Sequence, residues 1–98
     1  MQTLTPAMRK SLLISLLRDP SRWPKDFRWD FMDSTCCAMG LHAQVFENRI
    51  FERATGLVER RHLQEVLNLT EGDGTWVFSL GGRNTTADDV ANRLEMIT

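Results

Sequence analysis

The chain has 98 residues, of which 42% are hydrophobic and 26% are charged, and its formal net charge at pH 7 is −1. This length fits one small globular domain, 1–98, and excludes a second domain, most cofactor-binding folds and any multidomain enzyme. A dedicated nucleic-acid-binding protein usually carries a basic excess, because contacts with phosphates supply much of its affinity. The balanced charge therefore argues against nucleic acid as the partner.

The charges are spread unevenly along the chain. Residues 1–30 carry six basic and three acidic side chains, whereas residues 64–98 carry two basic and six acidic ones. Such polarity can steer a charged partner toward one side of a protein, although it also arises by chance in short chains.

Two features concern the cellular compartment. Cys36 and Cys37 are adjacent, and adjacent cysteines rarely pair because the ring they would close is strained. The longest apolar stretch, 12–17, is interrupted by Ser15 and is far too short to span a membrane. No small-residue cleavage pattern follows it, so it does not resemble a signal peptide. We therefore expect a cytoplasmic protein with reduced cysteines and no membrane contact.

Apolar periodicity predicts four helices, over residues 6–18, 36–47, 57–69 and 86–97. Thr5 and Pro6 are typical of a helix start, and Thr86 is a suitable cap for the last helix. Gly40 lies inside the second helix, where glycine costs about 1 kcal/mol relative to alanine. We therefore expect Gly40 to pack closely against another backbone segment. Residues 48–55 are ambiguous and could extend the second helix.

Two short segments alternate apolar and polar residues as a strand does. They are residues 27–31 and residues 75–80, the second of which follows a predicted turn at 70–74. We predict an α+β fold that is mainly α, in which about four helices pack with a short two-stranded antiparallel ribbon. The predicted core consists of Leu12, Leu13, Leu16, Leu17, Trp29, Phe31, Met39, Val45, Phe46, Leu63, Leu67, Val90 and Leu94.

The two cysteines suggest one catalytic hypothesis. A cysteine at a helix N-terminus can have a lowered pKa, and a thiol-dependent enzyme using Cys36 or Cys37 would also need a histidine base. His42 shares a helical face with neither cysteine, so His62 would have to approach from another helix. The alternative is that both cysteines are small buried residues at the start of a core helix.

Neither a metal nor a cofactor is expected. The two cysteines, His42 and His62 lack the paired spacing of a zinc site, and a satisfied core histidine is the commoner outcome for His42. The glycine pairs at 72–74 and 81–82 match no phosphate-binding loop. Asp33 is better placed to cap a helix than to act as a general acid or base.

The aromatic residues suggest a binding surface. A core of this size absorbs two or three tryptophans, and Trp23 lies in a proline-bounded loop among basic residues. Tryptophan and arginine are enriched in interface hot spots. The alternative is that Trp23 folds back as a lid over the first helix. The predicted partner-binding residues are Arg22, Trp23, Lys25 and Arg28.

We therefore expect a non-enzymatic protein-interaction module that binds a protein or ribonucleoprotein partner, or a second copy of itself as a homodimer. Proteins of this size often regulate or inhibit a larger macromolecular complex, including some encoded by phages or mobile elements. The run 37–41, preceded by 29–31, resembles stretches of small uncharacterised bacterial and phage proteins and implies no function. The two alternatives to the protein-interaction module are the thiol-dependent enzyme and a DNA-binding regulator that uses the region Arg49–Arg61, although glutamates are interleaved with these arginines.

Overall fold

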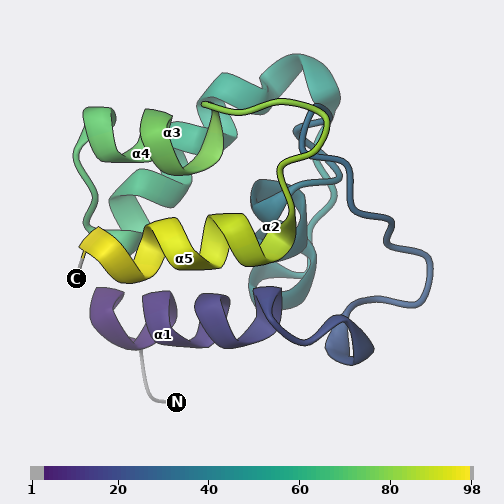
Figure 1. The fold of residues 1–98 in the computed structure, drawn as a ribbon, viewed down its shortest axis with the longest axis horizontal. Coiled ribbons are helices and arrows are strands. Elements are labelled where there is room, and N and C mark those ends of the chain that lie inside the picture. Colours follow the sequence, from purple (N-terminus) through teal and green to yellow (C-terminus); the bar gives the residue numbers. More distant parts are fainter. Residues whose placement is uncertain (1–3, 98) are drawn as a thin grey trace.

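The structure is a computed structural model that describes residues 4–97, which form five α-helices and two short 3-10 turns (Figure 1). The helices are α1 (Pro6–Leu17), α2 (Ala38–Glu47), α3 (Gly56–Leu67), α4 (Glu71–Phe78) and α5 (Ala87–Ile97). The 3-10 turns are η1 (Pro20–Arg22) and η2 (Arg53–Thr55).

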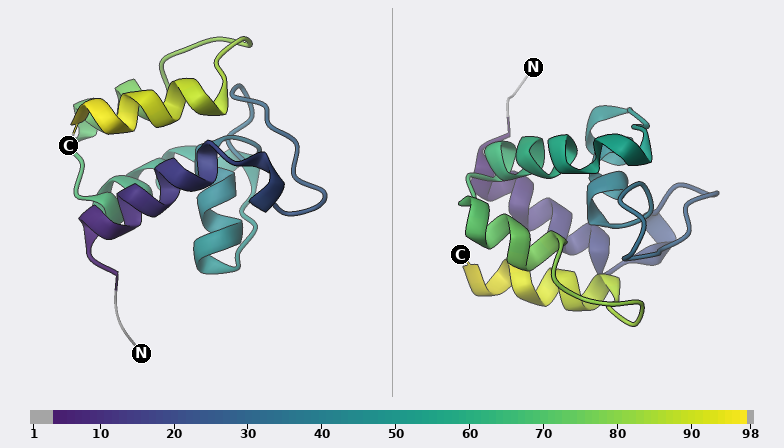
Figure 2. Two further views of the ribbon diagram at one scale, coloured as in Figure 1. Left: turned by 60° about the horizontal axis from the view of Figure 1, so that its bottom comes forward. Right: turned by 90° about the horizontal axis from the view of Figure 1, so that it is seen from above.

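The helices pack as two pairs with α2 at one end. α1 and α5 lie side by side and run in opposite directions, and α3 packs on α4 (Figure 1). α1 also contacts α3, and α4 contacts α5, so the four helices enclose one core. α2 contacts α3 and stands at a steep angle to α1 (Figure 2). None of the helices within residues 4–97 combines the length and apolar character needed to cross a bilayer.

Nine of the thirteen predicted core residues are buried, two are partly buried and two are exposed. Leu12 is 40% exposed and Val45 is 42% exposed, so both predictions were wrong. Trp29 and Phe46 are partly buried and pack against the core from outside. The predicted core residues that are buried are Leu13, Leu16, Leu17, Phe31, Met39, Leu63, Leu67, Val90 and Leu94.

Threonine side chains cap the N-termini of three of the helices. Thr5 Oγ1 accepts a hydrogen bond from the Met8 amide at 3.1 Å, which confirms the predicted start of α1. At α5, Thr86 Oγ1 accepts from the Asp89 amide at 3.1 Å while Asp89 Oδ2 accepts from the Thr86 amide at 2.9 Å. Such reciprocal bonds satisfy amide groups that the helix itself leaves unpaired. These capping bonds determine the residue at which each of these helices begins.

The predicted α+β class is wrong, because no strand occurs in residues 4–97. The segment 75–80 belongs mostly to α4, which begins in what was predicted to be a turn. Thr70 caps this helix by accepting from the Asp73 amide at 3.1 Å. The buried residues of α4 are Gly74, Val77 and Phe78, which follow the i, i+3, i+4 spacing of a helix. Gly74 leaves room for the side chain of Gln64 on α3.

The segment 27–31 is an irregular stretch without a partner strand. Its alternation does place Phe31 in the core, with Phe27 and Trp29 packed against it. The backbone is held instead by turns, including a hydrogen bond of 2.9 Å from the Asp30 amide to the Cys36 carbonyl. The alternation therefore comes from aromatic side chains of a loop that pack in or against the core. The predicted ribbon does not exist.

The expectation for Gly40 is confirmed. A β-carbon at this position would lie 1.9 Å from the carbonyl oxygen of Thr35. The loop that precedes α2 thus passes directly over the helix at its glycine.

Candidate functional site

The connection between α1 and α2, residues 18–37, is the longest segment without an α-helix in the described chain. It projects from the end of the α1–α5 layer (Figure 1). Connections of more than about 12–15 residues are uncommon in small domains and usually carry function or are disordered. This one is held in shape by buried and half-buried aromatic side chains, and we call it the aromatic loop.

Trp23 ties the first half of the aromatic loop to α1. Its indole Nε1 donates to the Leu16 carbonyl at 2.7 Å. Its ring packs edge-on against Phe27, with centroids 5.5 Å apart, and lies 6.1 Å from the ring of Trp29. Trp23 is therefore half-buried and folded back on α1, as the alternative from the sequence held.

Trp29 and Asp33 tie the second half of the aromatic loop. Trp29 Nε1 donates to the Thr85 carbonyl at 3.0 Å, which joins the loop to the start of α5. Asp33 Oδ1 accepts from the Thr35 hydroxyl at 2.8 Å and from the Thr35 amide at 3.0 Å. These bonds hold the pKa of Asp33 below its ordinary value. Asp33 stabilises the turn that leads into α2, and the expectation that it caps the helix was wrong, because the N-cap residue of α2 is Cys37 and no side chain makes a capping bond there.

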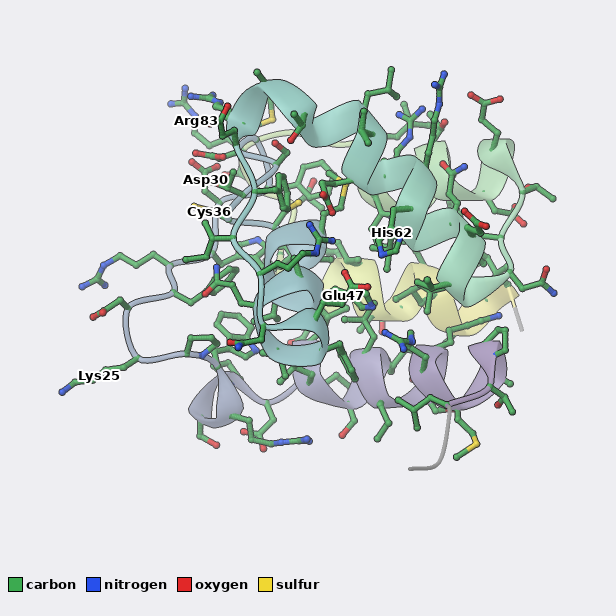
Figure 3. All side chains as sticks on the ribbon, turned by 180° about the vertical axis from the view of Figure 1, so that it is seen from behind. Lys25, Asp30, Cys36, Glu47, His62 and Arg83 are labelled. Carbon is green, nitrogen blue, oxygen red and sulfur yellow. The ribbon has the colours of Figure 1, made fainter. Side chains whose placement is uncertain are left out.

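The other predicted partner-binding residues lie on the outside of the aromatic loop. Arg22, Lys25 and Arg28 are all exposed, and Lys25 points outward from the rest of the molecule (Figure 3). Arg22 Nη1 donates to Ser15 Oγ at 3.2 Å, which turns that guanidinium back along α1. The structure thus places three of the four predicted residues at the surface and uses Trp23 mainly as an anchor.

A cleft of about 260 Å³ lies between the aromatic loop, the end of α1 and the start of α5. Trp23, Trp29 and Arg18 are among the residues that line it. Arg18 is held by Glu95 at 2.7 Å and lies 4.0 Å from Asp88. The remaining lining residues are Leu17, Pro20, Thr86, Ala87 and Asp88.

A second polar feature, which the sequence analysis missed, lies where α2 meets α3. His62 Nε2 and Glu47 Oε2 are 2.6 Å apart, and Arg49 Nη2 donates to Glu47 Oε1 at 2.6 Å (Figure 3 shows Glu47 and His62). Arg49 also makes two bonds to Glu59, of 2.8 and 2.9 Å. We call Glu47, Arg49, Glu59 and His62 the ionic cluster.

The ionic cluster keeps both carboxylates ionised. Burial opposes ionisation of Glu47, but the hydrogen bonds from His62 and Arg49 outweigh it and lower the pKa of Glu47. The hydrogen bond from Arg49 lowers the pKa of Glu59. The same bonds raise the pKa of Arg49, which stays charged. Each acid is matched by a base, so the cluster supports packing of α2 on α3.

His42 lies on α2 close to the ionic cluster and is 2% exposed. Its Nε2 is 3.3 Å from Arg9 Nη1, and its ring stacks on Phe46 with centroids 5.0 Å apart. Burial lowers the pKa of His42 to about 4, so the ring is neutral at pH 7. The expectation of a satisfied core histidine is thus confirmed.

The cysteines and histidines occupy separate environments. Cys37 is buried, its Sγ donates to the Ser34 carbonyl at 3.4 Å, and burial raises the pKa of its thiol to about 11. Cys36 Sγ lies 3.6 Å from Thr35 Oγ1. His42 is engaged by Arg9 and His62 by Glu47, as described above. Within residues 4–97 no three His, Cys, Asp or Glu side chains gather in a way that could hold a metal ion.

The arginines of the region 49–61 do not form a uniform basic face. Arg49 is neutralised by two glutamates, and Arg60 Nη1 donates to Ser79 Oγ at 2.9 Å. Of the four arginines in this region, only Arg53 and Arg61 are exposed. This arrangement offers little positive potential to a phosphate backbone.

Comparison of the chain with models of protein families, with curated proteins and with solved structures finds no match.

Proposed function

We propose that the protein is a non-enzymatic protein-binding module and that the aromatic loop is its binding surface. The observation that carries this proposal is the anchoring of the loop by Trp23 and Trp29, whose indole groups bond to Leu16 and Thr85. A long connection that is fixed in this way has already lost much of its conformational entropy before a partner arrives, which favours binding.

The chemistry of the loop indicates the kind of partner. Arg22, Lys25 and Arg28 present cations on its outer side, and Trp23 and Trp29 line the adjacent cleft. An acidic protein surface that offers an apolar side chain to the cleft would fit both features. In this proposal the protein acts in the cytoplasm as a regulator or inhibitor, by occupying a surface of a larger protein or ribonucleoprotein assembly.

The test is affinity capture with a charge-reversed variant. Tagged wild-type protein and the variant Lys25→Glu/Arg28→Glu are used to capture partners from the cells in which the protein is made. The matched control is Arg53→Glu/Arg61→Glu, which reverses two exposed arginines outside the loop. Captured proteins are quantified by mass spectrometry, and melting temperatures are measured for all three proteins.

The proposal predicts a partner that the wild type and the control retain and that the loop variant loses at least tenfold, with all melting temperatures unchanged. Equal capture by the loop variant and the wild type contradicts it. Loss by the control alone would instead place binding on the η2–α3 side.

A further inference from the structure

The Arg9–His42 contact joins α1 to α2 at a part-buried place, where His42 is buried and Arg9 is half-buried. Arg9 Nη1 lies 3.3 Å from His42 Nε2, and the Arg9 guanidinium carbon lies 5.8 Å from the centre of the Phe46 ring. Phe46 stacks on His42 in turn. The guanidinium of Arg9 on α1 therefore contacts the rings of both His42 and Phe46 on α2.

This geometry sets the protonation state of His42. A guanidinium has only donors, so His42 Nε2 must be the acceptor in this contact. An imidazole nitrogen accepts only when it carries no proton, which requires the neutral ring with its proton on Nδ1. A protonated His42 would direct an N–H at the N–H of Arg9 and place two positive charges side by side.

The charged groups around His42 come from every neighbouring element. Arg9 faces it from α1, His62 from α3 and Arg49 from the segment after α2, and all three oppose its protonation. Glu47, on α2 itself, favours protonation, but its oxygens are already engaged by Arg49 and His62. Burial is the largest influence and acts in the same direction as the three basic groups.

We propose that the α1–α2 junction is an acid-sensitive latch, in which the contact of Arg9 with His42 holds only while His42 is neutral, so that acid favours the unfolded chain, whose free histidine takes up the proton. The ionic cluster lies close to His42, and its hydrogen bonds keep Glu47 and Glu59 paired with Arg49 and His62 over the same range of pH. Mild acid thus lowers the stability of the fold through this contact before it protonates the carboxylates of the ionic cluster.

The direction of the effect follows from linkage. The ordinary pKa of histidine is 6.5, and the pKa of folded His42 is about 4. Below pH 6.5 the unfolded chain binds this proton and the folded chain does not, so stability is lost as the pH falls toward 4. The pKa values of Glu47 and Glu59 are lowered from 4.5, so their contribution is lost only at more acidic pH. The interval between pH 6.5 and about 5 therefore separates the effect of His42 from that of these two carboxylates.

Two measurements test the latch. The first follows the ring signals of both histidines by NMR as the pH is lowered from about 7.5 to 4. The second records the melting temperature over the same range for the wild type and for His42→Gln, whose side-chain oxygen can accept from Arg9 at every pH. His62→Gln is the matched control and also assigns the NMR signals.

The latch predicts that the His42 ring stays neutral at pH 5 and that the wild-type melting temperature falls by roughly 5 °C between pH 6.5 and 5. The fall persists in His62→Gln and is at least halved in His42→Gln. If His42→Gln does not fold, Arg9→Met replaces it, because removal of the cation makes His42 easier to protonate and shifts its titration toward higher pH. Titration of His42 near pH 6.5 in the wild type overturns the proposal, as does a fall that is undiminished in the folded variant used.

Discussion

The carbonyl oxygen of Thr35 occupies the place where a β-carbon at residue 40 would have to lie. The separation would be 1.9 Å, and the carbonyl carbon of Thr35 would be only 2.4 Å away. Both are backbone atoms and cannot rotate aside as a side chain can. The loop before α2 thus packs directly against Gly40, and this contact links the position of α2 to that of the aromatic loop.

Gly40→Ala should therefore destabilise the protein, although alanine is the better helix former by about 1 kcal/mol. We expect a net loss of about 2 kcal/mol in the free energy of unfolding, because the loop backbone must move. Gly72→Ala is the control, since its β-carbon would meet only Thr70 Oγ1 at 3.9 Å and should be neutral or stabilising. Urea unfolding measures the stability of both variants. Equal stability of the two would contradict the close backbone contact at Gly40.

The indole bonds of Trp23 and Trp29 should govern the order of the aromatic loop. Trp23→Phe and Trp29→Phe remove the donors to Leu16 and Thr85, and each should cost about 1 kcal/mol. Trypsin should then cut after Lys25 or Arg28 several times faster than in the wild type, because local opening exposes the loop to the protease. Trp76→Phe on α4 serves as the control and should leave the cleavage rate unchanged. Unaltered cleavage in both loop variants would mean that the indole bonds do not fix the loop.

Arg49 should be the central residue of the ionic cluster. Arg49→Met keeps an apolar stem but leaves Glu47 and Glu59 without their shared cation, at a cost of about 1–2 kcal/mol at low salt. The cost should shrink as salt is added, because part of the cluster is exposed. The variant should also lose less stability than the wild type below pH 4.5, since Arg49 lowers the pKa of both carboxyl groups.

Arg61→Met is the matched substitution at an exposed arginine on α3 and should change stability by less than about 0.5 kcal/mol. Denaturant titrations at two salt concentrations distinguish the variants. A salt-independent loss in Arg49→Met would show that packing of its stem, and not charge, is what it contributes.

The two cysteines should differ in reactivity. In a Cys36→Ser variant the remaining Cys37 is buried and its pKa is raised to about 11, so iodoacetamide should label it only as fast as the chain unfolds. In a Cys37→Ser variant the half-buried Cys36 should react faster, and both variants should react alike in denaturant. Labelling of either folded variant that is already fast at pH 6 would revive a thiol-dependent function.

The sequence predicts four of the five α-helices because their local signals agree. Thr5-Pro6 and Thr86 mark helix starts, and the apolar spacing continues from each of them. α4 was missed because Gly72 and Gly74 are typical of turns, and because Trp76 and Phe78 alternate as in a strand. The helical signal was present in the cap at Thr70, but the need for Gly74 arises only from the packing of α4 on Gln64.

The candidate site was predictable only in part, for a related reason. Positions of exposed residues on one loop follow from the sequence, so Arg22, Lys25 and Arg28 were placed at the surface correctly. The contact of Glu47 with His62 depends on how α2 lies against α3, which no local pattern encodes. The inward turn of Trp23 likewise depends on a carbonyl of α1 that is available only once that helix has formed.

Hydrogen exchange of this protein, in the presence of the captured partner, tests most directly whether the aromatic loop is the binding surface. Amide exchange is measured with and without the partner, at a protein concentration that saturates the complex. If the aromatic loop is the binding surface, exchange slows within residues 18–37 and at the start of α5 around Thr86, with little change in α3. Protection confined to another surface, or no protection anywhere, would contradict the assignment of the aromatic loop as the binding surface.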